Sequence, residues 1–223
     1  MSLCQLGLAL LLPGFLLGQE RPVATGAEPD QEERTESVGL LQDAGMVRVA
    51  GAGIEEFEID LYEFPNQRGA LPRINVSWEE AAAACAERGK RLCAEPEWRR
   101  ACAGPANLLY GYGSVFEPGR CNTPYPVAGV WRRGQGLARS GDFAGCASEY
   151  GVYDLIGNVW EWTAGRYTED QDWRVVRGGS WFHNANLATS ESRYGRYLSP
   201  DYRLDLIGFR CCRSVPEPGT PQP

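Results

Sequence analysis

The chain has 223 residues and a formal net charge of −7. An acidic chain lacks the basic surface that displaces counterions from nucleic acid, so we expect no nucleic-acid partner. Its 27 glycines, 15 prolines, 7 tryptophans and 10 tyrosines favour a loop-rich domain whose interior is filled by aromatic side chains rather than by long helices.

The first 43 residues predict export followed by a linker. Residues 1–18 contain an apolar stretch, Leu3–Leu17, that is too short to span a bilayer and has the length of a signal segment. We therefore expect a periplasmic or extracellular protein, with envelope association left open and no transmembrane helix. Residues 19–43 are rich in Glu, Pro, Thr and Gly and predict a disordered linker, as the proline-rich residues 216–223 predict a disordered tail. The domain is expected over 44–215.

Local patterns predict two helices in the first half of the domain. Ser77 and Glu80 form an S-x-x-E capping box before an alanine run, which predicts a helix over 78–88. Pro96 lies where a second helix would begin, and Gly104 would end it. We expect the two helices to form a short pair.

The strands are predicted from alternation and from short apolar runs. Phe57–Tyr62 alternates apolar residues with acidic or polar ones, as in a half-buried strand. Strand-like runs also occur at Val159–Trp162, Arg174–Arg177 and Ile207–Cys211.

The cysteines indicate disulfides rather than zinc. Cys4 belongs to the predicted signal segment, and seven cysteines belong to the domain, so at least one thiol stays free or pairs between chains. No C-x-x-C pair is present, and His183 is the only histidine, which does not suit a zinc site.

Seven separated segments, in a shared order, resemble the formylglycine-generating enzyme (sulfatase-modifying factor) family. They are Asn75-Val-Ser-Trp78, Gly89-Lys-Arg-Leu92, Glu95-Pro-Glu-Trp98, Tyr150-Gly-Val-Tyr-Asp154, Gly157-Asn-Val-Trp-Glu-Trp162, Arg177-Gly-Gly-Ser-Trp181 and Gly208-Phe-Arg-Cys211. The resemblance implies an α+β fold that is similar to the C-type lectin fold, with little regular secondary structure and small antiparallel sheets. Fold alone does not decide function, because the chemistry depends on particular side chains.

The resemblance also locates the catalytic positions. Catalytic members hold Cu(I) with two cysteines after the Gly-Gly-Ser segment, and soft thiolates suit that ion. The matching positions here are His183 and Ala188, and residues 181–207 contain no cysteine. We therefore expect no copper and no catalysis of the family's kind. We interpret His183 as a residue of the surface or the cleft, with a replacement metal ligand as the alternative.

One structural calcium is implied by the resemblance. Carboxylates of Asp154 and Glu161 and carbonyls of Gly157 and Val159 match a family calcium site, and hard oxygen ligands suit Ca²⁺. The alternative is a tight turn held by the Asp154 and Asn158 side chains without an ion.

The resemblance implies one disulfide directly, between Cys85 and Cys211. A second family bridge would use Cys102, whose usual partner is missing, and we expect Cys121 to replace that partner. Three cysteines remain without an assigned partner: Cys93, Cys146 and Cys212.

Three functions are compatible with these observations. The first is a non-catalytic module whose aromatic cleft binds a peptide, protein or glycan. The expected lining residues are Trp160, Trp162, Ser180, Trp181, Phe182, His183 and Tyr194. The second is a structural protein displayed by its linker. The third is a divergent oxidoreductase of the formylglycine-generating type that uses another metal or a partner.

Overall fold

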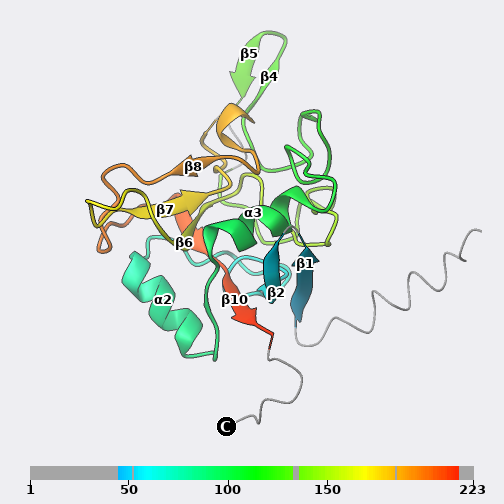
Figure 1. The fold of residues 1–223 in the computed structure, drawn as a ribbon. Helices are drawn as coiled ribbons and strands as arrows, with labels where there is room; N and C mark the ends of the chain where they lie inside the picture. The colour runs from blue at the N-terminus through cyan, green and yellow to red at the C-terminus, as the bar shows by residue number, and fades with distance from the viewer. Residues whose placement is uncertain (1–44, 52, 133–135, 184, 216–223) are drawn as a thin grey trace, which may run out of the picture.

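A computed structural model describes residues 45–51, 53–132, 136–183 and 185–215 (Figure 1). The predicted signal segment (1–18), linker (19–43) and tail (216–223) lie outside these residues. Among the described residues, no helix is long and apolar enough to cross a membrane.

The first sheet joins the two ends of the domain (Figure 1). Its four strands have the order β1-β2-β10-β3. They are β1 (Met46–Gly51), β2 (Ile54–Asp60), β3 (Arg91–Leu92) and β10 (Cys211–Ser214). The predicted strand at Phe57–Tyr62 overlaps β2, which begins earlier and ends at Asp60. Because β10 pairs with both β2 and β3, the last strand holds two early segments together.

The second sheet has the order β8-β7-β6-β9, in which β6 and β9 are parallel and the other pairs are antiparallel. Its strands are β6 (Trp160–Arg166), β7 (Arg174–Arg177), β8 (Arg193–Tyr194) and β9 (Ile207–Phe209). The predicted run Ile207–Cys211 is divided between the two sheets, because β9 ends before Arg210 and β10 begins after it.

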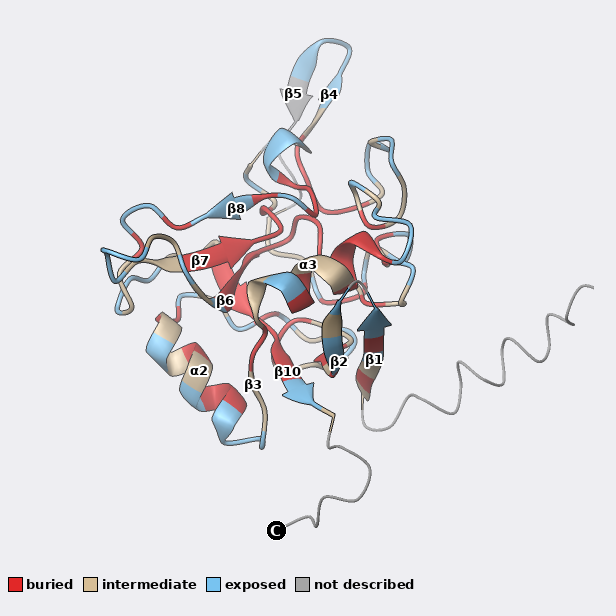
Figure 2. Ribbon diagram, in the orientation of Figure 1, coloured by how far each residue is buried: buried red, intermediate tan, exposed pale blue. Residues whose placement is uncertain are grey.

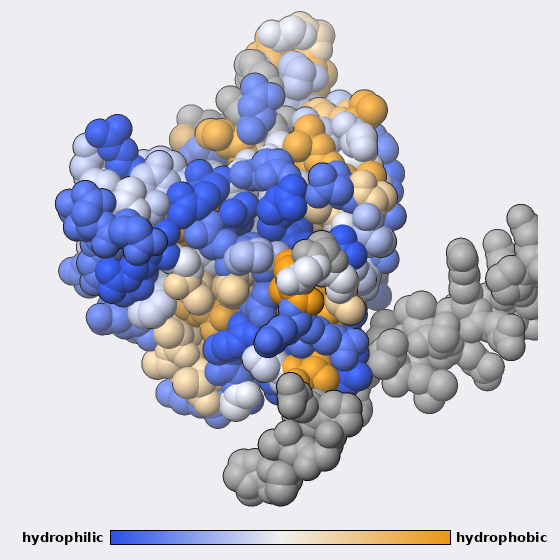
Figure 3. Space-filling view, viewed as in Figure 1, coloured by the Kyte–Doolittle hydropathy of each residue, from blue (hydrophilic) through white to orange (hydrophobic). Residues whose placement is uncertain are grey.

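A two-stranded hairpin projects from the body of the domain (Figure 1). It consists of β4 (Tyr125–Val127) and β5 (Val130–Arg132). Polar side chains cover much of the face in Figure 3, whereas apolar ones gather on this hairpin, where Val127 and Val130 are exposed.

Both predicted helices are present. α2 (Trp78–Ala86) begins with the predicted capping box, in which the Glu80 amide donates to Ser77 Oγ at 3.1 Å and the Ser77 amide donates to Glu80 Oε2 at 3.0 Å. α3 (Glu95–Ala103) ends at Gly104, whose φ of 68° favours glycine. A short 3-10 helix covers Ala185–Leu187.

The two predicted helices pack against different parts of the core. Buried residues of α2, including Ala81 and Cys85, belong to one core cluster, whereas Trp98 and Ala101 of α3 belong to another. The extended segment that contains β3 separates the helices along the chain, and each then packs on a different part of the sheets (Figure 2). Their closeness in sequence therefore does not produce a helix–helix contact surface.

Three disulfides connect the domain. Cys85 bonds to Cys211, as the resemblance implies, and Cys93 bonds to Cys212. Cys211 and Cys212 are adjacent in β10, and successive side chains of a strand point to opposite faces, so the two bonds leave the strand in different directions.

The predicted Cys102–Cys121 bond is wrong. Cys121 bonds instead to Cys146, and Cys102 is the one free cysteine among the described residues. Cys102 is buried in α3, and burial raises the pKa of its thiol, which makes the reactive thiolate form scarce.

A buried ion pair lies between the two sheets. Arg210 Nε donates to Glu161 Oε2 at 2.8 Å and Nη2 donates to Oε1 at 2.7 Å. The Trp98 indole also donates to Glu161 Oε2, at 2.7 Å. Arg210 is completely buried, and its remaining N–H groups donate to the carbonyls of Asp60 and Tyr153 at 3.1 and 2.8 Å. Both charged groups are therefore well supplied with hydrogen-bond partners.

We predict that Arg210→Met destabilises the domain by about 3–5 kcal/mol, because it leaves the Glu161 carboxylate buried without its guanidinium. The matched control is Arg213→Met, which removes an exposed arginine paired with Glu58 and should cost less than about 1 kcal/mol. Urea denaturation of both variants measures the difference. Equal unfolding free energies for the two would contradict the prediction.

Candidate functional site

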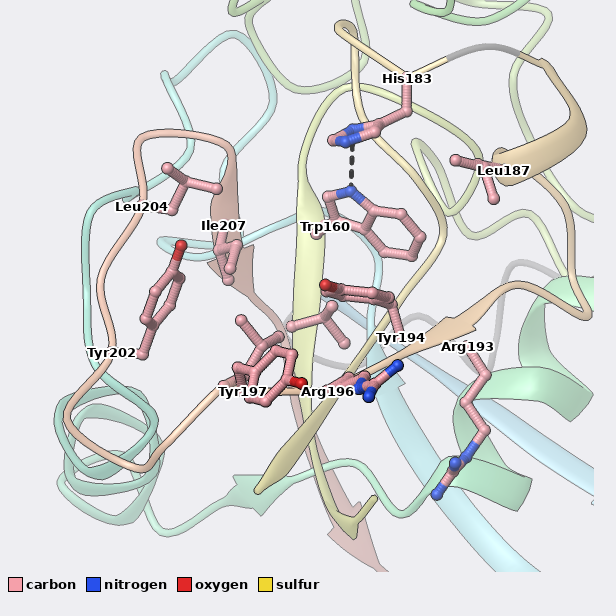
Figure 4. Close-up of a pocket in the computed structure, with 12 residues that line it drawn as sticks. Trp160, His183, Leu187, Arg193, Tyr194, Arg196, Tyr197, Tyr202, Leu204 and Ile207 are labelled. Atoms are coloured by element: carbon pink, nitrogen blue, oxygen red, sulfur yellow. Dashed lines mark hydrogen bonds between the residues drawn. The ribbon is translucent and has the colours of Figure 1, made fainter. Parts of the chain in front are cut away.

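A cavity of about 560 Å³ opens beside the second sheet (Figure 4). Its walls are mainly aromatic and aliphatic, with two arginines. The lining residues are Trp160, Val176, His183, Leu187, Arg193, Tyr194, Arg196, Tyr197, Leu198, Tyr202, Leu204 and Ile207. A volume of this size accommodates one large side chain with part of its backbone or a small ligand.

The cavity is built from the sheet and from the chain that follows β8. Trp160 of β6 and Ile207 of β9 come from neighbouring strands, and Figure 4 shows Leu204 and Leu187 on opposite sides. Tyr194 and Tyr197 are exposed at 48% and 62%, so both rings are available to a ligand.

His183 is held in one orientation beside the cavity. The Trp160 indole N–H donates to His183 Nδ1 at 3.0 Å, and Ser180 Oγ lies 2.8 Å from the same nitrogen. An indole nitrogen is only a donor, so Nδ1 carries the lone pair and the proton of the neutral ring is on Nε2. Burial lowers the pKa of His183. The ring therefore contributes a neutral polar edge rather than a cation.

Ala188 has a different environment from His183. It is completely buried and belongs to the core cluster that contains Trp98 and Cys102. Gly179, with φ of 79°, approaches it so closely that a Cβ at position 179 would lie 2.9 Å from the Ala188 Cβ. The two positions thus differ: His183 lines the cavity, and Ala188 is packed behind it.

The structure brings together three of the seven predicted cleft residues. Trp160, His183 and Tyr194 line the cavity. Trp162 does not, because it is buried in the core and its indole donates to the Val76 carbonyl at 3.0 Å.

The other three predicted cleft residues also lie outside the lining. Ser180 is fully buried and supports His183. Trp181 and Phe182 pack against each other with their ring centroids 5.8 Å apart, and neither belongs to the cavity wall.

The segment that closes the cavity was not predicted from the sequence. Arg196, Tyr197, Tyr202 and Leu204 all come from the chain between β8 and β9. The signal that could have indicated it is the density of tyrosines in this short stretch, which has neither strand nor helix periodicity.

The four predicted calcium ligands lie at and beyond the turn that precedes β6. Asp154 has a left-handed φ of 59°, and its Oδ2 accepts from the Gly141 amide at 2.7 Å. Glu161 is already paired with Arg210, so one lone pair on Oε1 is left for another partner. Gly157 and Val159 supply backbone carbonyls, and Val159 is fully buried.

This region contains more buried acid than buried base. Glu63 is fully buried, and its pKa is raised by burial and by the nearby Asp154 and Glu161 carboxylates. Burial raises the pKa of Asp154 to about 6. Arg210 is the guanidinium that faces all three. In chemical terms the hard oxygens and the excess negative charge fit a divalent cation, although the described residues contain no group of three or more His, Cys, Asp or Glu side chains arranged around one metal position.

The family model for the sulfatase-modifying factor enzyme 1-like domain matches residues 23–215 of this chain. The chain belongs to this family. A curated relative, the inactive Cα-formylglycine-generating enzyme 2 of Bos taurus, is 39% identical over 168 residues, which are 66% of this chain and 52% of the relative. The formylglycine-generating enzyme of Mus musculus is 30% identical over 170 residues, 65% of this chain and 44% of that protein. The chain spans about half the length of these relatives.

Solved structures confirm the α+β fold expected from the resemblance. PvdO from Pseudomonas aeruginosa superposes with a TM-score of 0.56 at 18% identity and covers 77% of this chain and 92% of its own. Treponema denticola variable protein 1 has a TM-score of 0.57 at 18% identity and covers 76% and 95%. At this identity they show that the sulfatase-modifying factor domain shares their fold, and they say nothing of its ligand.

We predict that His183 of this sulfatase-modifying factor domain titrates below about 6.5, the ordinary value for histidine. Because the pKa of His183 is lower in the folded than in the unfolded state, the unfolded chain binds more protons as pH falls. The contribution of this residue to stability is therefore lost as pH falls below about 6.5. Because His183 is the only histidine, its imidazole resonances can be followed by NMR without assignment.

Two comparisons control this measurement. The same titration in denaturant gives the unfolded value, and Trp160→Phe removes the indole N–H that faces Nδ1 and should raise the folded midpoint. A folded midpoint equal to or above the unfolded one would contradict the environment described for His183.

Proposed function

We propose that this formylglycine-generating-enzyme-like domain is non-catalytic and binds a polypeptide segment in the cavity beside β8. The observation that carries the proposal is the apolar cavity that His183 lines. His183 and Ala188, at the positions that the resemblance matches to the catalytic cysteines, supply no thiolate. A relative named as inactive, at 39% identity, supports the non-catalytic part.

The chemistry of the wall favours a peptide over a glycan. Among the described residues that line the cavity, none is an acid or a side-chain amide, the groups that usually pair with sugar hydroxyls. Tyrosines and tryptophan offer large contact area with little loss of rotamer freedom. β8 is also the terminal strand in the order of its sheet, and an extended peptide can lie along such a strand.

Export is part of the same proposal. Three disulfides form within the described residues. Disulfides persist in oxidising compartments and are rare in the cytosol, which supports a secreted or periplasmic location.

We predict that binding depends on an apolar anchor residue. Fluorescein-labelled Gly/Ser decapeptides with a central Phe or Leu should bind in anisotropy titrations, and the same peptide with a central Gly should not, because only a large apolar group fills the cavity. Leu204→Asp places a charge in the wall and should abolish binding. The matched control is Leu71→Asp, at an exposed leucine outside the cavity.

Three outcomes of these experiments would contradict the proposed function. One is equal binding of the Phe and Gly peptides. Another is saturable binding of chitin oligosaccharides with none of the peptides. The third is copper-dependent conversion of a Cys-x-Pro-x-Arg peptide to the aldehyde, detected by mass spectrometry, since His183 and Ala188 supply no thiolate.

The proposal includes one structural calcium ion, held by the Asp154 and Glu161 carboxylates and the Gly157 and Val159 carbonyls. The surplus of buried carboxylates around Glu63 supports it, because a divalent cation would offset their repulsion. The role is structural: the ion would stabilise the turn from which β6 and Trp160 begin.

We predict that chelation lowers the melting temperature of the domain. A ligand at a hundredfold excess over its dissociation constant stabilises by about 2.7 kcal/mol when the native state alone binds it. Asp154→Gly removes the ligand oxygen and tolerates the left-handed φ, so it should abolish the sensitivity to chelator. Asp154→Asn keeps both an oxygen and the conformation, and should retain it.

This pair of variants avoids the ambiguity of changing Glu161, which would also leave Arg210 unpaired. Identical melting curves of the unmodified protein in calcium and in chelator would sink the calcium assignment and leave a turn held by side-chain hydrogen bonds.

A further inference from the structure

Positive charge gathers at one side of the cavity. Arg193 and Arg196 both line it, and Figure 4 shows their guanidinium groups on the same side, below Tyr194. Arg196 is exposed, and its Cζ lies 5.0 Å from the centroid of the Tyr197 ring. The described ion pairs do not include Arg196.

The neighbouring acid does not balance this charge. Glu95 accepts from Arg193 Nε at 2.7 Å and from Arg177 Nη2 at 2.9 Å, so one carboxylate serves two guanidinium groups. Arg196 has no carboxylate partner among the described ion pairs, so its charge adds to this group. The whole chain has a formal net charge of −7. The positive charge at this side of the cavity is therefore opposite in sign to the net charge of the chain.

The acids of the adjoining segments include Asp205, which is exposed and lies outside the cavity wall. Asp201 accepts from the Ser199 hydroxyl at 2.5 Å, and Glu80 pairs with Arg203. Asp172 pairs with Arg174 at 2.8 Å. None of these carboxylates belongs to the cavity wall. A bound ligand therefore meets apolar walls and, beside them, the guanidinium of Arg196, which has no carboxylate partner among the described ion pairs.

We propose that the cavity selects peptides in which an apolar or aromatic side chain is adjacent to a carboxylate, from Asp, Glu or a chain end. This inference rests on the proposed function and deepens it. The apolar side chain enters between Leu204 and Leu187, and the carboxylate meets the guanidinium group of Arg196, because that of Arg193 already donates to Glu95 through Nε and Nη2. A guanidinium donates two parallel hydrogen bonds to a carboxylate in one plane. This geometry gives orientation as well as affinity.

The same charge disfavours a basic neighbour. A Lys or Arg side chain next to the anchor would be placed against like charge without a described wall carboxylate to pair with it, and such repulsion is an effective source of specificity. The cavity thus discriminates by the sign of the residue beside the anchor, whereas the anchor itself is recognised by size and hydrophobicity.

Three peptides that differ at one position test this inference. Fluorescein-labelled decapeptides with a central Phe-Glu, Phe-Gln or Phe-Lys in a Gly/Ser background are titrated with the full chain at low and at moderate salt. We expect Phe-Glu to bind about fivefold more tightly than Phe-Gln at low salt, with the difference shrinking as salt rises, and Phe-Lys to bind most weakly.

Charge reversal at the surface identifies the residue responsible. Arg196→Glu should invert the order, so that Phe-Lys binds more tightly than Phe-Glu. The matched control is Arg203→Glu, an exposed arginine of the same segment outside the cavity wall, which should leave the order unchanged.

The outcomes separate the two proposals. If no Phe peptide binds, the proposed function itself fails. If all three bind equally, or if Arg196→Glu keeps the preference for Phe-Glu, the domain binds peptides but the charge selection is overturned. Inversion by Arg196→Glu together with an unchanged order in Arg203→Glu supports the inference.

Discussion

The buried pair of Arg210 and Glu161 is the interaction on which the arrangement of the two sheets depends. Arg210 lies where the chain passes from β9 of one sheet to β10 of the other, and Glu161 lies in β6. The same carboxylate accepts from Trp98 of α3. Two charges are costly to bury unless their hydrogen bonds are complete. The pair therefore fixes both sheets and α3 at one position relative to one another, because any displacement leaves a buried charge without a partner.

The position of the cavity follows from this arrangement. Side chains alternate across a strand, so Glu161 of β6 points toward α3 while Trp160 and Trp162 point to the opposite face. Trp162 is farther into the core and is covered, whereas Trp160 reaches the cavity and holds His183. The residue that anchors the core and the residue that forms the wall are thus consecutive, and a one-residue shift of β6 would exchange their faces.

Features that depend on short stretches of sequence were predicted well, whereas distant contacts were predicted only where the family resemblance supplied them, as for Cys85–Cys211. The capping box at Ser77 and the end of α3 at Gly104 follow from neighbouring residues, and the structure confirms both. The Cys121–Cys146 bond and the isolation of Cys102 depend on how loops pass each other, which spacing does not specify. Trp162 was wrongly placed in the cleft because alternation defines a face of β6 but not how far along that face the covering chain extends.

The two positions that the resemblance matches to the family's catalytic cysteines have different physical environments. His183 lines the cavity, where its neutral ring keeps the wall polar at one point. Ala188 is enclosed in the core against Gly179, so a larger side chain there would require the surrounding core to shift, at a cost of about 1–3 kcal/mol. One position lies at the wall of a cavity, and the other is constrained by the packing of the core. A pair of thiolates at these two positions would have to satisfy both environments, whereas the cavity wall is formed by residues of all four strands of the second sheet and of the segments on either side of β8. The cavity wall therefore does not depend on a thiolate at either position.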